Sequence, residues 1–129
     1  DRALDGEPLT VYEPGTQSRN YVHIKDVAEA YLRSAEVLLD QLDAGQTGAR
    51  TYEIASDEDP SVMDLAKLVS DVSAAERGVD VPVETVENPR DNETLVTDFA
   101  VDTTRAHEEL GWRPTHTIEE TVRDLLATD

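Results

Sequence analysis

Gly15-Thr16-Gln17-Ser18-Arg19-Asn20-Tyr21-Val22-His23-Ile24-Lys25-Asp26-Val27-Ala28 is the stretch that decides the fold, because its pattern changes from strand to helix within a few residues. Residues 20–24 alternate in polarity, which predicts a short strand. Asp26 has the side chain of a good N-cap, so we expect a helix over residues 27–42. Its expected buried face is a stripe at helical spacing, made of Val27, Ala30, Tyr31, Ser34, Val37 and Leu38.

Strand and helix patterns alternate along the rest of the chain. Residues 2–4 are expected to end a helix before Gly6 and Pro8, and a turn is expected at Pro14 and Gly15. Further strands are expected over 9–12, 51–55 and 81–86, and further helices over 62–72, 103–110 and 118–126. Ser61 and Thr117 are the expected N-caps of two of these helices. The fold class is therefore α/β, or α+β in isolation, with short strands and about four helices in one domain over residues 1–129.

The composition is strongly acidic, with 29 Asp and Glu against 11 Lys and Arg and a net charge of −18. Such a charge repels nucleic acids and anionic membrane surfaces, so neither is expected as a partner. The periodic apolar pattern argues against disorder. We expect instead the surface of a protein from a high-salt cytoplasm, where salt screens the repulsion between carboxylates. The chain contains no cysteine, which excludes disulfides and thiolate chemistry.

Three segments, in order, resemble the C-terminal region of the extended short-chain dehydrogenase/reductases, the family of UDP-glucose 4-epimerase and dTDP-glucose 4,6-dehydratase. The first runs from Gly6 to Ala28 and contains the stretch quoted above. The second is Thr51-Tyr52-Glu53-Ile54-Ala55 with Ser61-Val62-Met63-Asp64-Leu65. The third is Arg90-Asp91-Asn92-Glu93, followed by Asp102-Thr103-Thr104-Arg105-Ala106 and Leu110-Gly111-Trp112-Arg113-Pro114.

The resemblance implies that this chain is the nucleotide-sugar-binding part of an NAD- or NADP-dependent epimerase or dehydratase. An N-terminal Rossmann domain would supply the cofactor and the catalytic residues, and the whole enzyme would be a cytoplasmic homodimer. The first residue, Asp1 rather than Met, agrees with an upstream part. We therefore expect no catalytic residue, cofactor or metal on the chain itself, and no activity from it alone.

The resemblance also implies roles for individual residues. Guanidinium groups form two parallel hydrogen bonds with phosphate oxygens, and the arginines at the positions of Arg19 and Arg90 hold the substrate diphosphate in the family. Glu93 would accept hydrogen bonds from ribose hydroxyls. Gln17, Val11 and Tyr12 would line the nucleotide pocket. From composition alone, an arginine in such an acidic chain is more often a surface ion-pair partner than a ligand-binding residue.

Several patterns favour a structural interpretation or another function. Tyr21 and Lys25 match a Tyr-x-x-x-Lys catalytic pair, but four residues of a strand span about 13 Å, which would separate the two groups. Trp112 is expected to anchor the core, and residues 57–59 to form a solvated acidic turn. The run Asn88-Pro89-Arg90 resembles UDP-sulfoquinovose synthases, which is one alternative. A non-catalytic domain that docks a basic partner through its acidic face is the other.

Overall fold

The computed structural model describes residues 1–90 and 100–128. These residues contain two short parallel strands and four helices. The strands are β1 (Leu9–Tyr12) and β2 (Val83–Val86), paired in parallel with Leu9 opposite Val83. The helices are α1 (Ile24–Asp43), α2 (Val62–Arg77), α3 (Thr104–Leu110) and α4 (Ile118–Ala127). The α/β class expected from the sequence is confirmed.

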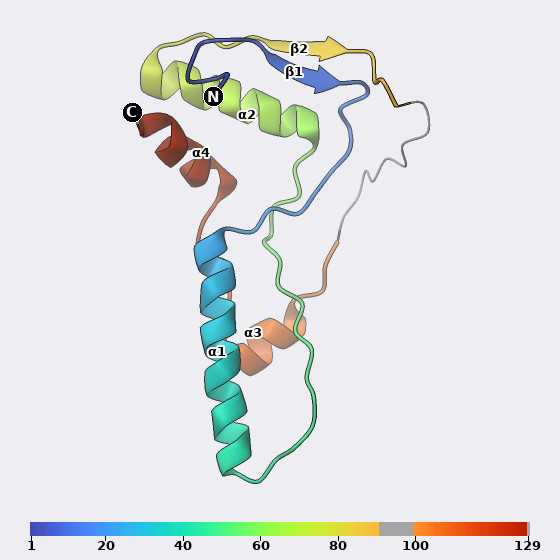
Figure 1. The fold of residues 1–129 in the computed structure, drawn as a ribbon, viewed down its shortest axis with the longest axis vertical. Helices are drawn as coiled ribbons and strands as arrows, with labels where there is room; N and C mark the ends of the chain where they lie inside the picture. The colour runs from blue at the N-terminus through green and yellow to red at the C-terminus, as the bar shows by residue number, and fades with distance from the viewer. Residues whose placement is uncertain (91–99, 129) are drawn as a thin grey trace.

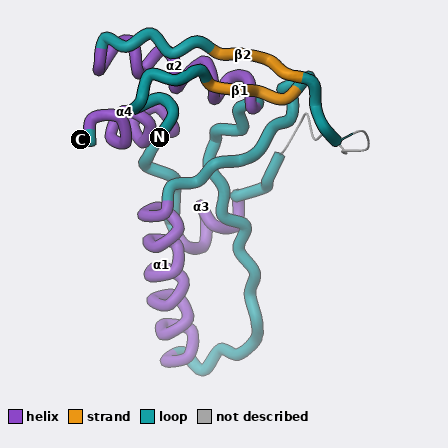
Figure 2. Tube along the Cα trace, turned by 45° about the horizontal axis from the view of Figure 1, so that its top comes forward, coloured by secondary structure: helices purple, strands orange, loops and turns teal. Residues whose placement is uncertain are grey.

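These elements form two regions that meet near the start of α1 (Figure 1). We call β1, β2, α2 and α4 the sheet layer, in which α2 packs against both strands and against α4. We call α1 and α3 the helical arm, which extends away from the sheet layer in both views (Figure 2). The loop from α3 to α4 leads from the arm back to the sheet layer.

Each region has its own apolar cluster. In the sheet layer, Ala3, Val72 and Leu126 are buried and pack with partly buried residues of β1, α2 and α4. In the arm, Trp112 is fully buried among Ala30, Ala106 and Leu110, as expected for a core anchor. Each region is thus stabilised by a small apolar cluster of its own.

The helix ends that depend only on residues close in sequence lie where the sequence predicts them. Ser61 and Asp64 form a reciprocal capping box at the start of α2, and Thr117 and Glu120 form another at the start of α4. Gly111 ends α3 in the left-handed conformation. Other boundaries differ slightly: α2 continues to Arg77, β2 begins at Val83 rather than at residue 81, and residues 2–6 form turns rather than the end of a helix.

The start of α1 corrects the sequence analysis. Residues 20–23 contain no strand, and α1 begins at Ile24 with His23, not Asp26, as the N-cap. The His23 Nδ1 accepts the backbone N–H of Lys25 at 3.1 Å. Asp26 lies inside the first turn and is only 1% exposed, because residues 112–116 cover it. The predicted cap was wrong because the carboxylate has partners distant in sequence.

The predicted buried stripe of α1 is also partly wrong. Ala30 is buried, but Tyr31 is 77% exposed and Leu38 is 50% exposed. Helix α3, Trp112 and the Tyr52–Ile54 region pack against one side of α1, and part of the predicted stripe has no cover within residues 1–90 and 100–128. The strand predicted over 51–55 is not formed either.

Tyr21 precedes α1 and Lys25 lies in its first turn, so the two residues do not share one face of a helix. Within the described ranges, no helix combines the length and apolar character needed to cross a membrane.

Candidate functional site

A pocket of about 270 Å³ opens where β1 and β2 end. Parallel strands point their carboxyl ends to the same edge, and ligands of open α/β sheets bind outside that edge. The chain segments after both strands and the start of α2 surround the pocket. Its lining residues are Thr10, Tyr12, Glu13, Pro14, Gly15, Gln17, Val62, Asn88, Pro89 and Arg90.

The turn after β1 forms the floor of this pocket. Gly15 has a φ of 69°, and a Cβ placed on it would lie 2.8 Å from Cγ1 of Val11, so a side chain there would clash. The Gly15 carbonyl accepts the Met63 N–H at 3.0 Å, and the Gln17 carbonyl accepts the Val62 N–H at 2.9 Å. These bonds fix the turn against the start of α2.

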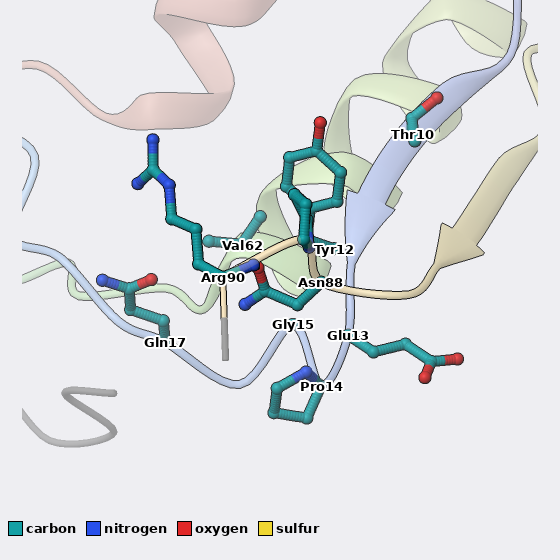
Figure 3. Close-up of a pocket in the computed structure, with 10 residues that line it drawn as sticks. Thr10, Tyr12, Glu13, Pro14, Gly15, Gln17, Val62, Asn88 and Arg90 are labelled. Atoms are coloured by element: carbon teal, nitrogen blue, oxygen red, sulfur yellow. The ribbon is translucent and has the colours of Figure 1, made fainter. Parts of the chain in front are cut away.

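The chain after β2 also lines the pocket, through Asn88, Pro89 and Arg90. The Asn88 side-chain Oδ1 accepts the backbone N–H of Arg90 at 3.0 Å, which closes a local turn around Pro89. Figure 3 shows the Gln17 amide and the Arg90 guanidinium at the left, the Tyr12 ring across the Arg90 side chain from Gln17, and the Glu13 carboxylate directed away; Tyr12, Gln17 and Arg90 all line the pocket. A cation, an amide and an aromatic ring therefore surround one space.

This set of groups suits an anionic ligand that also has a flat or polar ring. The guanidinium can bind phosphate oxygens, the amide can both donate and accept, and the tyrosine can stack or donate from its hydroxyl. Among residues 1–90 and 100–128 no group of three or more His, Cys, Asp or Glu could hold a metal ion.

The structure brings together three of the six residues singled out from the sequence: Tyr12, Gln17 and Arg90. Val11 is only 2% exposed and packs under Gly15 rather than lining the pocket. Arg19 is exposed two residues beyond Gln17, with its Nη1 donating to the Ser18 carbonyl at 3.3 Å, and is not part of the pocket lining. The expected convergence of two arginines on one hollow is thus not seen in this pocket. Glu93 lies outside the described residues.

Sequence reasoning missed Thr10 and gave Asn88 no role in the site. Thr10 lies in β1 beside Tyr12, and the strand prediction alone did not say which of its residues would border a pocket. Asn88 followed by Pro89 is a turn signal directly after the predicted strand, which could have placed both at a strand end.

Comparison with known proteins shows the family. The model of the GDP-mannose 4,6 dehydratase family matches residues 2–125, nearly the whole chain. The chain therefore belongs to this family.

Among relatives, a UDP-glucose 4-epimerase from Erwinia amylovora is 31% identical over 87% of this chain and 30% of its own length. A UDP-glucose 4-epimerase structure from Thermotoga maritima with UDP-glucose matches 97% of this chain and 35% of that one, with a TM-score of 0.72 and 26% identity. A UDP-glucose 4-epimerase from Stenotrophomonas maltophila, with bound NAD and formylated UDP-arabinopyranose, matches 97% and 36% with a TM-score of 0.71 and 28% identity. The chain thus spans about a third of the length of these proteins.

Proposed function

We propose that this chain is the nucleotide-sugar-binding part of an NAD- or NADP-dependent sugar epimerase or dehydratase, and that it has no activity alone. The observation that carries the proposal is the pocket at the strand ends, where Arg90, Gln17 and Tyr12 meet. The bound ligands named for the two structural relatives, UDP-glucose and a formylated UDP-arabinopyranose, are nucleotide sugars of the kind this pocket suits.

In this proposal Arg90 binds a phosphate group of the ligand. Its guanidinium borders the pocket in a chain whose net charge is −18, so a local cation is needed to offset the repulsion between a diphosphate and the surrounding carboxylates. Gln17 and Tyr12 contact the nucleoside. Arg19 and Glu93 are proposed to complete the ribose and diphosphate contacts in the whole enzyme.

Calorimetric titration with UDP and UDP-glucose tests the proposal. We expect weak binding of both, reduced at least about tenfold by Arg90→Gln because a charged hydrogen bond contributes about 1.5 to 3 kcal/mol. Arg113→Gln is the matched control, because it removes the same charge from an exposed residue outside the pocket lining. Absence of nucleotide binding, or equal losses in both variants, would contradict the proposal and favour a non-catalytic acidic interaction domain.

We further propose that a Rossmann domain of the same polypeptide supplies the cofactor and covers the exposed side of α1. Tyr31, with Tyr52 and Ile54 beside it, borders an apolar hollow of about 240 Å³. Ile24, Leu38 and Leu42 continue the same side of the helix, and each is at least half exposed. Exposed apolar surface of this extent marks an interaction site, and the relatives are about three times longer than this chain.

The acidic surface supports a proposal of a high-salt cytoplasm as the working environment. We expect the melting temperature to rise between low and multimolar KCl, because salt screens the repulsion of 29 acidic side chains. Equal or greater stability at low salt would contradict this.

A further inference from the structure

The two regions of the molecule meet at a pair of stacked histidines. The rings of His23 and His116 lie nearly parallel, with centroids 4.2 Å apart and an interplanar angle of 13°. His23 caps α1 of the arm, and His116 immediately precedes the N-cap of α4 in the sheet layer. The stack therefore joins the start of α1, in the arm, to the loop that precedes α4, in the sheet layer.

Beside the stack, Asp26 fastens the α3–α4 loop to α1. Its carboxylate accepts the backbone N–H groups of Thr115 and His116 at 3.1 and 3.0 Å and the Thr115 hydroxyl at 2.8 Å. The His116 Nδ1 lies 2.8 Å from Oδ1 of the same carboxylate, so this contact requires a proton on Nδ1. The Trp112 indole N–H donates to the Asp26 carbonyl at 2.8 Å.

His23 requires the opposite state of its own Nδ1. That nitrogen accepts the Lys25 N–H, which it can do only while it carries no proton. Protonation would turn the acceptor into a donor and place a positive charge at the N-terminus of a helix of 20 residues, where the helix dipole disfavours cations. It would also put a charge against the stacked ring of His116.

Other charged groups surround the pair. On α1 these are Lys25, which follows the cap, and the carboxylate of Asp26. From α4 the carboxylate of Glu120 interacts with His116, and Glu58 accepts the Ile118 N–H at 2.8 Å close to the same loop. The carboxylates near the pair already interact with His116 or with the start of α4. They therefore do not replace His23 as the acceptor of the Lys25 N–H when His23 is protonated.

We propose that His23 is a proton-operated release between the helical arm and the sheet layer: neutral His23 caps α1 and stacks on His116, and protonated His23 opens both contacts. Histidine is the side chain whose charge ordinarily changes between about pH 5 and 8, and this range sets the conditions of the test. Acidification in this range loosens the first turn of α1 while the Asp26 contacts remain.

The test uses urea unfolding of the 129-residue chain at constant ionic strength from pH 8 to pH 5, followed by the fluorescence of Trp112, the single tryptophan. Asparagine caps helices well and does not titrate, so His23→Asn keeps the cap at all pH values. We expect the unfolding equilibrium constant of the wild type to increase about fivefold more than that of His23→Asn over this range, the size of one lost helix cap. His107→Gln is the control, because the His107 ring lies 6.4 Å from Trp112 and could itself alter the fluorescence.

A second measurement uses the unmodified chain and does not depend on the folding of a variant. The chain has three histidines, so the Hε1 resonance of His23 can be followed individually by NMR. We expect the hydrogen-exchange protection of the Lys25 amide to fall along the same curve as this resonance titrates. Identical pH dependence of wild type and His23→Asn, or constant protection of Lys25 while His23 titrates, would overturn the proposal.

Discussion

The sheet layer and the helical arm differ in how much of their apolar surface other elements of the described chain cover. In the sheet layer the two strands pair with each other, and α2 packs against both strands and α4. In the arm, a helix of 20 residues packs against a partner of seven, and Ile24, Tyr31 and Leu39 each remain at least 60% exposed. The sequence of the arm thus encodes more apolar surface than the described chain covers, which is typical of an element that contacts a further domain.

The two apolar clusters also differ in the size of their buried side chains. This difference gives the largest expected effect on the free energy of unfolding. The arm depends on Trp112, whose replacement by Ala should lower the free energy of unfolding by about 3 to 5 kcal/mol. Val72→Ala in the sheet layer removes a smaller side chain and should cost about 2 kcal/mol. Urea unfolding followed by circular dichroism at 222 nm measures both, and equal losses would show that the arm does not depend on one anchor.

Within the sheet layer, the turn under the pocket should be less tolerant than a turn at the tip of the arm. Gly15→Ala should cost about 2 to 4 kcal/mol, because it adds a clash with Val11 to the cost of a left-handed φ. Gly45→Ala is the matched control, with a φ of 73° and no atom within 4 Å of the added Cβ, and should cost about 1 to 2 kcal/mol. The difference in thermal stability between the two variants isolates the clash. No difference would mean that the turn shifts freely.

The junction between the regions should weaken in acid. Burial raises the pKa of Asp26, but hydrogen bonds from His116 and Thr115 outweigh it and lower the pKa from 3.8 to about 2. The folded state therefore binds this proton less readily than the unfolded chain. The resulting stability is present above pH 3.8 and is lost as the pH falls toward 2.

This contribution amounts to about 2 kcal/mol. The stability difference between wild type and Asp26→Asn should narrow by that amount from pH 5 to pH 2 in urea titrations. The exposed Asp59→Asn should not produce the same narrowing. A constant difference for Asp26→Asn would show that its carboxylate does not link the two regions.

The smallest effect is expected on the exposed side of α1. Replacing Tyr31, Leu38 and Leu42 together by Gln should change the stability of the 129-residue chain by less than about 1 kcal/mol, because these side chains are at least half exposed. In the full-length polypeptide the same triple substitution should cost several times more if a further domain covers this surface. Thermal melts measure both effects, and equal effects in the two proteins would contradict the prediction that a further domain covers this side of α1.

The comparison also explains which predictions from the sequence succeeded. The capping boxes at Ser61 and Thr117 were predictable because each involves residues only three positions apart. The N-cap of α1 was not, because the role of Asp26 depends on Thr115 and His116, about 90 positions away. The strand expected over 51–55 has the right alternation, but a strand also needs a neighbour, and no described residue pairs with it there.

The residues of the candidate site also divide into those that local sequence could predict and those that tertiary contacts placed there. The end of β1 and the turn at Pro14 and Gly15 that follows it were predictable from local pattern, and Tyr12 and Gln17 on either side of this turn line the pocket. Asn88 reached the site because β2 pairs with β1 in parallel, which places the segment after β2 beside the turn after β1. Arg19 is close to Gln17 in sequence, yet it lies outside the pocket lining.

The sequence alone determined the α/β class, most helix ends and the family resemblance, because these depend on side-chain type and on contacts within a few residues. Only the tertiary structure decided that Asp26 is buried, that His23 stacks on His116, and that Arg90 rather than Arg19 borders the pocket. Those features arise from residues brought together by strand pairing and helix packing, and a linear pattern carries no information about which distant groups will meet.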